Sequence, residues 1–120
     1  MQRRYRLRRS TDFELLRRSG LQFRHPLAIL VVRANREQIS RFGFMVSKRL
    51  GKATARNRVK RRLREVVRSR IDMIQPGWDV LIIARYAITK AEYAELDDAV
   101  SELLRRADLL QAQDNSLESN

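Results

Sequence analysis

Two stretches of the chain carry apolar residues at helical spacing. The longer covers about residues 54–74, and the Pro-Gly pair at 76–77 predicts that the helix ends before it. The other covers residues 93–107 and follows Thr89 and Glu92, which predict a capping box at the start of a closing helix. The two apolar stripes consist of Val59, Leu63, Val66, Val67, Ile71 and Ile74, and of Tyr93, Leu96, Val100, Leu103, Leu104 and Ala107.

A shorter helix is predicted near the start of the chain. Thr11 is its expected N-cap, Glu14 completes the capping box, and Gly20 is the expected residue after its end. Two apolar runs rich in β-branched or aromatic residues follow, at 27–32 and 42–46. They predict two strands that pair as a hairpin.

The remaining apolar run, residues 80–84, lies between the two long helices and predicts a buried strand. The elements then follow in the order α-β-β-α-β-α, which predicts an α+β fold, a two-layer sandwich with a small sheet packed on helices. The length of 120 residues indicates one domain. We expect this domain to span residues 1–110, with residues 1–9 as an extended basic arm and residues 111–120 as a flexible polar tail.

Charge is distributed unevenly along the chain. There are 26 basic and 14 acidic residues, a net charge of +12, but residues 1–70 hold 22 of the basic residues and only 4 of the acidic ones. A strongly positive half attracts polyanions, and nucleic acid is the commonest polyanion in a cytoplasm, the compartment that we expect. Most of the cations are arginines, whose guanidinium group grips phosphate through two hydrogen bonds and stacks on bases.

The composition excludes several other kinds of site. There is no Cys, which excludes disulfides, iron–sulfur clusters and thiol nucleophiles, and the single His25 excludes a pair of histidines in acid–base catalysis. The longest fully apolar run, residues 27–32, is too short to span a bilayer. We therefore expect no membrane partner, and no signal peptide, because no apolar segment follows the basic N-terminus.

The long central helix places its cations on the side away from its apolar stripe. This exposed row suits a phosphate backbone, because only Glu65 interrupts it, whereas a merely solvated face usually alternates Glu with Lys. Arg56 falls on the core side, and we expect it to reach past the helix start toward the sheet edge. The row consists of Asn57, Arg61, Arg64 and Arg68, flanked by Arg58 and Arg62. The densest anion site is expected at Lys48, Lys52, Arg56, Asn57 and Arg58.

The segment from residue 43 to residue 61 resembles the signature of the bacterial ribonuclease P protein subunit family. Its motifs are Gly43-Phe44-Met45-Val46-Ser47-Lys48-Arg49, then Gly51, then Ala55-Arg56-Asn57-Arg58-Val59-Lys60-Arg61. Further matching motifs are Arg6-Leu7-Arg8 ahead of Asp12-Phe13, Asp79-Val80-Leu81-Ile82-Ile83-Ala84-Arg85, and Leu103-Leu104-Arg105-Arg106. The resemblance covers about residues 4–108, nearly the whole domain.

This resemblance implies an accessory protein subunit that joins a large catalytic RNA. The pair removes the 5′ leader of precursor tRNA, and hydrolysis depends on Mg²⁺ bound mainly by the RNA. No catalytic residue is expected in the polypeptide, and the arginine-rich helix, including Lys60, is expected to face the catalytic RNA. The resemblance implies a monomer that forms a 1:1 complex with the RNA. It also implies a left-handed β-α-β crossover, in a fold like that of ribosomal protein S5 domain 2.

The resemblance also implies a cleft between the sheet and the first helix that binds the single-stranded leader. Phe13 matches the family's aromatic residue on that helix, whereas Arg17 and Leu30 stand where the family has further aromatic residues. The expected leader site therefore consists of Phe13, Arg17, Leu30 and Phe44. We expect it to bind the leader more through charge and less through stacking than the better-known members of the family do. Alternation puts Phe44 and Met45 on opposite faces of their strand, and either face could line the cleft. Phe13 could equally be a core residue that anchors its helix.

A ribosomal or other structural RNA-binding protein of similar α+β fold is the alternative, because basic charge alone does not separate the two. A sequence-specific DNA-binding protein is disfavoured. The central helix lacks the preceding partner helix and short turn that a helix-turn-helix motif requires.

Overall fold

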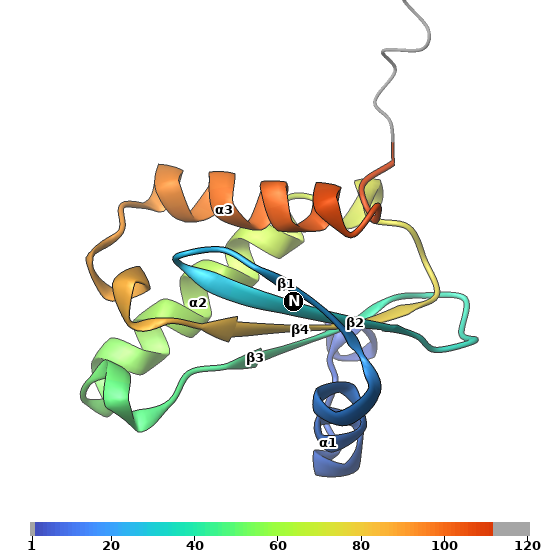
Figure 1. Ribbon diagram of the computed structural model, residues 1–120, viewed down its shortest axis with the longest axis horizontal. Helices are drawn as coiled ribbons and strands as arrows, with labels where there is room; N and C mark the ends of the chain where they lie inside the picture. Colours follow the sequence, from blue (N-terminus) through green and yellow to red (C-terminus); the bar gives the residue numbers. More distant parts are fainter. Residues whose placement is uncertain (1, 112–120) are drawn as a thin grey trace, which may run out of the picture.

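The computed structural model describes residues 2–111, in which helices cover both faces of a four-stranded sheet (Figure 1). The predicted α+β class is confirmed, but α1 covers the second face of the sheet, so the helices do not form a single layer as the two-layer prediction implied. The helices are α1 (Ser10–Ser19), α2 (Ala53–Arg68) and α3 (Tyr93–Arg106), and the strands are β1 (Leu21–Arg24), β2 (Ala28–Ala34), β3 (Arg41–Met45) and β4 (Trp78–Ala84). Short 3₁₀ turns are η1 (Arg3–Tyr5), η2 (Lys48–Leu50), η3 (Ile71–Met73) and η4 (Tyr86–Lys90).

The strands lie in the order β1-β2-β4-β3. β2 pairs antiparallel with β1 and with β4, whereas β3 pairs parallel with β4, so that α2 forms the crossover between parallel neighbours. The predicted hairpin between residues 27–32 and 42–46 is therefore wrong. β4, the most completely buried strand, lies between them, and the unpredicted β1 is the hairpin partner of β2. The left-handed course of the crossover stays a prediction.

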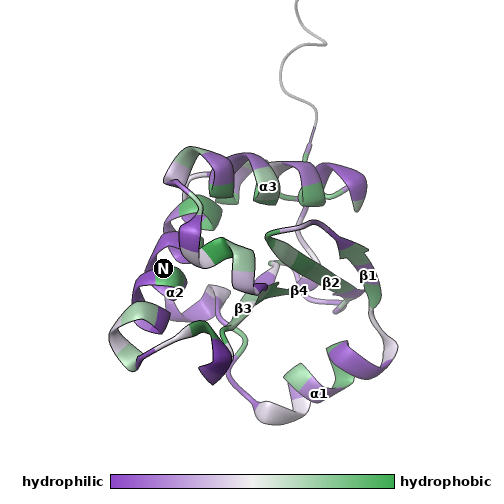
Figure 2. Ribbon diagram, turned by 60° about the vertical axis from the view of Figure 1, so that its left-hand side comes forward, coloured by the Kyte–Doolittle hydropathy of each residue, from purple (hydrophilic) through white to green (hydrophobic). Residues whose placement is uncertain are grey.

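Alternate strand residues divide the interior into two cores. Leu30 and Ile82 belong to the larger core beneath α2 and α3, whereas Val31 and Leu81 belong to the smaller core beneath α1. All four side chains are completely buried. Figures 1 and 2 show the same division, with α2 and α3 together on one side of the sheet and the shorter α1 on the other.

The central helix ends earlier than its apolar stripe predicts. α2 ends at Arg68, and Arg70 leaves helical geometry with φ −117° and ψ 6° before η3 begins. Ile71 and Ile74 nevertheless pack on the larger core. The apolar pattern continues past the end of α2 because the following 3₁₀ turn presents its side chains to the same core.

Both predicted capping boxes are wrong in position. Arg9 is the N-cap of α1, so Thr11 lies inside the first turn. The capping box of α3 is formed by Glu92 and Glu95, and the N–H of Glu92 donates to Oε1 of Glu95 at 2.8 Å. Thr89 lies in η4 instead. A carboxylate can cap a helix as well as a hydroxyl can, and here it replaces the expected threonine.

The basic N-terminal segment, predicted as an extended arm, is docked on the sheet. Leu7 is buried, and its N–H donates to the carbonyl of Phe42 at 2.8 Å. Arg6 forms a parallel bridge with the same residue, so the segment extends the sheet along the outer edge of β3. At the other end, the N–H of Gln111 donates to the carbonyl of Met73 at 2.7 Å. The rest of the predicted tail, residues 112–120, lies outside the described residues.

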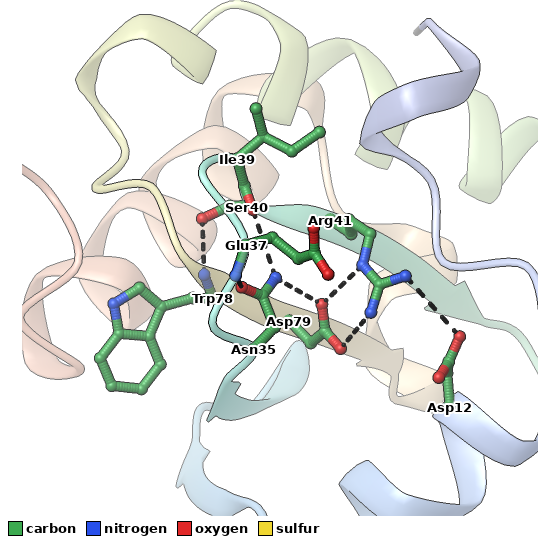
Figure 3. A network of polar contacts seen from close by, with 8 residues as sticks. All are labelled: Asp12, Asn35, Glu37, Ile39, Ser40, Arg41, Trp78 and Asp79. Carbon is green, nitrogen blue, oxygen red and sulfur yellow. Dashed lines mark hydrogen bonds and ion pairs between the residues drawn. The ribbon is translucent and has the colours of Figure 1, made fainter.

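A polar network ties the start of β3 to its neighbours (Figure 3). Asp79, 8% exposed, accepts hydrogen bonds from Nε and Nη2 of Arg41 at 3.0 and 2.9 Å and from Nδ2 of Asn35 at 2.9 Å. Asp12 of α1 lies 3.9 Å from Nη1 of the same arginine. The hydrogen bonds with Asp79 raise the pKa of Arg41 above its ordinary value. The network thus holds α1, the β2–β3 loop and β4 together.

Candidate nucleic-acid interface

The exposed side of α2 carries the predicted cationic row. Val59, Leu63, Val66 and Val67 are buried on the larger core, so the helical period turns the cations outward. Asn57, Arg58, Arg61 and Arg68 are exposed, and Lys60, Arg62 and Arg64 are half-buried. The structure therefore brings the predicted helix residues onto one element, as expected.

The cations of this row differ in how far they are already neutralised. Nη2 of Arg68 donates to both carboxylate oxygens of Glu65, at 2.9 and 2.7 Å. Arg70, just beyond the helix, pairs with Asp97 of α3. Within residues 2–111, Arg61 and Arg64 form no ion pair. Their positive charges are therefore available to an anion, unlike that of Arg68.

The N-terminal end of α2 concentrates further cations. Lys48 lies in η2 and Lys52 is the N-cap of α2, and both are exposed. Arg56 is half-buried and reaches back past the helix start, where its Nε donates to the carbonyl of Gly51 at 3.1 Å. This partner is the loop before the helix rather than the expected sheet edge. Gly51 adopts a φ of +129°, which favours glycine at this turn.

A groove at the edge of β3 joins the N-terminal segment to α2. It has a volume of about 260 Å³, and its residues combine free cations with aromatic rings. Its lining includes Arg6, Arg8, Lys60, Arg64, Phe13 and Phe44. Arg6 and Arg8 were not predicted as site residues, because only the docking of Leu7 on the sheet brings them beside α2. The Arg6-Leu7-Arg8 alternation was the available signal, since a buried residue between two cations is typical of an edge strand.

Phe13 combines the two roles that the sequence left open. Its ring packs in the smaller core and lies directly over Gly43, where an added Cβ would be only 2.5 Å from Cε1 of the ring. The same side chain is half-buried and lines the groove at the edge of β3. Phe13 is therefore a core contact of α1 whose outer part is accessible to a ligand.

The structure separates the remaining predicted leader residues. Leu30 is completely buried in the larger core, so its assignment to a ligand-binding site is wrong. Phe44 packs on the same core from the α2 side of the sheet, whereas Met45 lies on the α1 side. Arg17 is exposed on α1. The register of β2 places Leu30 opposite Phe23 and Ile82, both on the face covered by α2 and α3.

The α1 side of the sheet is only partly covered. Ile29, Met45 and Ile83 pack on the smaller core but keep part of their surface exposed, because the short α1 lies over Val31 and Leu81 instead. On the α1 side of β3, Met45 is half-buried, whereas Gly43 is buried beneath the ring of Phe13.

Within residues 2–111, no three His, Cys, Asp or Glu side chains are grouped so that they could hold a metal ion. The same part of the chain contains no helix that is long and apolar enough to cross a bilayer.

Comparisons with known proteins identify the family of the chain. A family model described as Ribonuclease P matches residues 1–108. A ribonuclease P protein component from Roseiflexus sp. (strain RS-1) is 41% identical over 116 residues, which cover 96% of this chain and 95% of the relative. Another, from Herpetosiphon aurantiacus, is 44% identical over 109 residues, which cover 91% and 89% of the two chains.

Solved structures show the same similarity. The RNase P protein from Thermotoga maritima matches with a TM-score of 0.79 at 30% identity, covering 84% of this chain and 96% of that one. The RNase P protein from Staphylococcus aureus matches with a TM-score of 0.83 at 25% identity, covering 89% and 98%. The chain therefore belongs to the family of ribonuclease P protein components and is a protein subunit of ribonuclease P.

Proposed function

We propose that this chain binds the catalytic RNA of ribonuclease P through α2 and assists removal of the 5′ leader from precursor tRNA. The observation that carries the proposal is the row of cations on α2, in which Arg61 and Arg64 have no ion-pair partner within residues 2–111. Lysine and arginine contacts to phosphates release counterions and supply most of the affinity for RNA. The surface in contact with the RNA comprises Lys48, Lys52, Arg56, Asn57, Arg58, Lys60, Arg61, Arg64 and Arg68.

The leader of the precursor is assigned to the groove at the edge of β3, whose lining also includes Lys60 and Arg64 of α2. Single-stranded RNA binds where aromatic rings lie beside a basic groove. Phe13 and Phe44 supply the rings of the groove at the edge of β3, and Arg17 adds an exposed cation on α1. Leu30 has no part in this proposal because it is completely buried.

The chemistry is assigned to the RNA rather than to the polypeptide. Mg²⁺ supplies Lewis-acid activation of the phosphodiester, and we assign its binding mainly to the RNA, since residues 2–111 bring together no group of metal ligands. The protein's contribution is to neutralise phosphates and to hold the leader, as a monomer in a 1:1 complex. No step of hydrolysis is assigned to a side chain of this chain.

A cleavage assay tests this function. The protein is added to a bacterial ribonuclease P RNA and a precursor tRNA at low Mg²⁺, where the RNA alone is slow. Stimulated release of the intact leader is expected. Binding to the RNA without any stimulation would contradict the proposal and favour a ribosomal or other structural RNA-binding protein. Cleavage by the protein without RNA would contradict the assignment of the chemistry to the RNA.

A further inference from the structure

The α3 side of α2 contains a second pocket, separate from the groove at the edge of β3. Its volume is about 460 Å³, within the range of small-ligand sites. It lies where η4 and the start of α3 pass the N-terminal half of α2, on the left of Figure 1. The lining residues that matter below are Arg58, Val59, Arg62, Ile88, Lys90 and Tyr93.

The pocket combines an apolar floor with a cationic rim. Val59 and Ile88 are buried and belong to the larger core, so the floor is a fixed part of the fold. Arg58, from α2, and Lys90, from η4, are exposed and line the same pocket. Nη1 of Arg62 donates to the carbonyl of Ala91 at 3.2 Å, which holds this guanidinium group against the wall.

The aromatic ring of Tyr93 lies at the same opening. This side chain is 40% exposed at the first position of α3. Glu92 is the acidic residue of the lining, and it is engaged in the capping box of α3 with Glu95. Three cations therefore face one carboxylate that already has a structural role.

We propose that this pocket binds one unpaired nucleotide of the catalytic RNA. The base stacks on Tyr93 over the apolar floor, and its phosphate lies between Arg58 and Lys90. An aromatic ring beside cations is the arrangement that binds an unstacked base together with its phosphate. The proposal rests on the proposed docking of RNA on α2, since Arg58 and Arg62 flank the exposed row of that helix.

The catalytic RNA is favoured over the leader of the precursor because of where the pocket lies. Its floor residues Val59 and Ile88 belong to the core beneath α2 and α3. The smaller core and the half-buried Phe13 lie on the other face of the sheet. The groove that Phe13 lines shares no lining residue with this pocket, so a strand held beside Phe13 does not by itself contact Tyr93.

The test measures affinity for a bacterial ribonuclease P RNA in the absence of precursor, at several KCl concentrations. Tyr93→Ala should weaken binding by about 5- to 150-fold, while Tyr93→Phe, which keeps the ring, should stay within about twofold of the parent. Lys90→Gln should lower the slope of log K against log salt by about 0.7–0.9, because one phosphate contact is lost. Tyr86→Ala is the matched control, since Tyr86 is an exposed tyrosine of η4 outside the pocket.

Equal affinities of the Tyr93→Ala and Tyr86→Ala proteins would overturn the proposal. So would an effect of Tyr93→Ala that appears only when precursor is added, because that result would assign the pocket to the leader. Circular dichroism of each variant checks that α3 is intact. As a second readout, p-benzoylphenylalanine incorporated at position 93 should crosslink to a single unpaired nucleotide of the RNA, and crosslinks confined to paired regions would contradict the proposal.

An additional variant separates this inference from the proposed function. Arg61→Ala combined with Arg64→Ala removes the central contacts of the α2 row without altering the pocket lining. If this double variant weakens binding and Tyr93→Ala does not, the nucleotide pocket fails while RNA docking on α2 stands. If neither variant weakens binding, the proposed function itself fails.

Discussion

The contact between Phe13 and Gly43 makes a sharp prediction about how α1 is seated on the sheet. In Gly43→Ala, the new Cβ would lie 2.5 Å from Cε1 and 2.8 Å from Cζ of Phe13, and 3.3 Å from Cβ of Leu7. Overpacking of this kind costs about 1–3 kcal/mol, and the reduced freedom of the unfolded chain returns about 0.4–1 kcal/mol. We therefore expect a net loss of about 1–2 kcal/mol in the free energy of unfolding, measured by urea denaturation.

A double-mutant cycle isolates the contact. In a Phe13→Ala background the ring is absent, so Gly43→Ala should cost little, and the coupling free energy should be about 1–2 kcal/mol. Val100→Ala is the control, because Val100 lies in the core on the opposite face and should combine additively with Phe13→Ala. A coupling below about 0.5 kcal/mol between positions 13 and 43 would refute the seating of Phe13 over Gly43.

Three further predictions follow from burial and pairing. Leu30→Ala should lower the free energy of unfolding by about 2–5 kcal/mol with no specific loss of precursor affinity, and unchanged stability in urea would contradict its buried position. Asp79→Ala should lower the free energy of unfolding by about 2–3 kcal/mol in the same assay. This is less than for a fully buried ion pair, because the Arg41 side chain is 30% exposed, and an unchanged stability would contradict the structural role of Asp79. Glu65→Gln frees Arg68 and should steepen the salt slope of RNA binding by about 0.7–0.9, whereas weaker binding would argue against Arg68 as an RNA contact.

The sequence predicts the elements of this fold better than their pairing. The stripes of α2 and α3 were found because helical periodicity is local. The hairpin assigned to residues 42–46 was wrong because β4, some 35 residues further on, takes the position beside both strands. β1 was missed because four residues carry too little alternation to stand out, and its role is apparent only from the register with β2.

The same distinction holds for the candidate site. The outward direction of Arg61 follows from the period of one helix, and the structure confirms it. Leu30 was wrongly assigned because the sequence does not show which face of the sheet the long helices cover. Leu30 lies on the face that α2 and α3 bury. The place of Arg8 beside Lys60 depends on the docking of the N-terminal segment along β3, and the local alternation around Leu7 indicates an edge strand but not the strand with which it pairs.

The salt dependence of RNA binding by Arg61→Ala combined with Arg64→Ala tests the docking of α2 on RNA most directly. A control of equal charge is Arg33→Ala combined with Arg105→Ala, both exposed and outside α2. We expect the slope of log K against log salt to fall by about 1.4–1.8 in the α2 variant, the loss of two phosphate contacts, and to stay unchanged in the control. Equal slopes in the α2 variant and the parent protein would contradict the account.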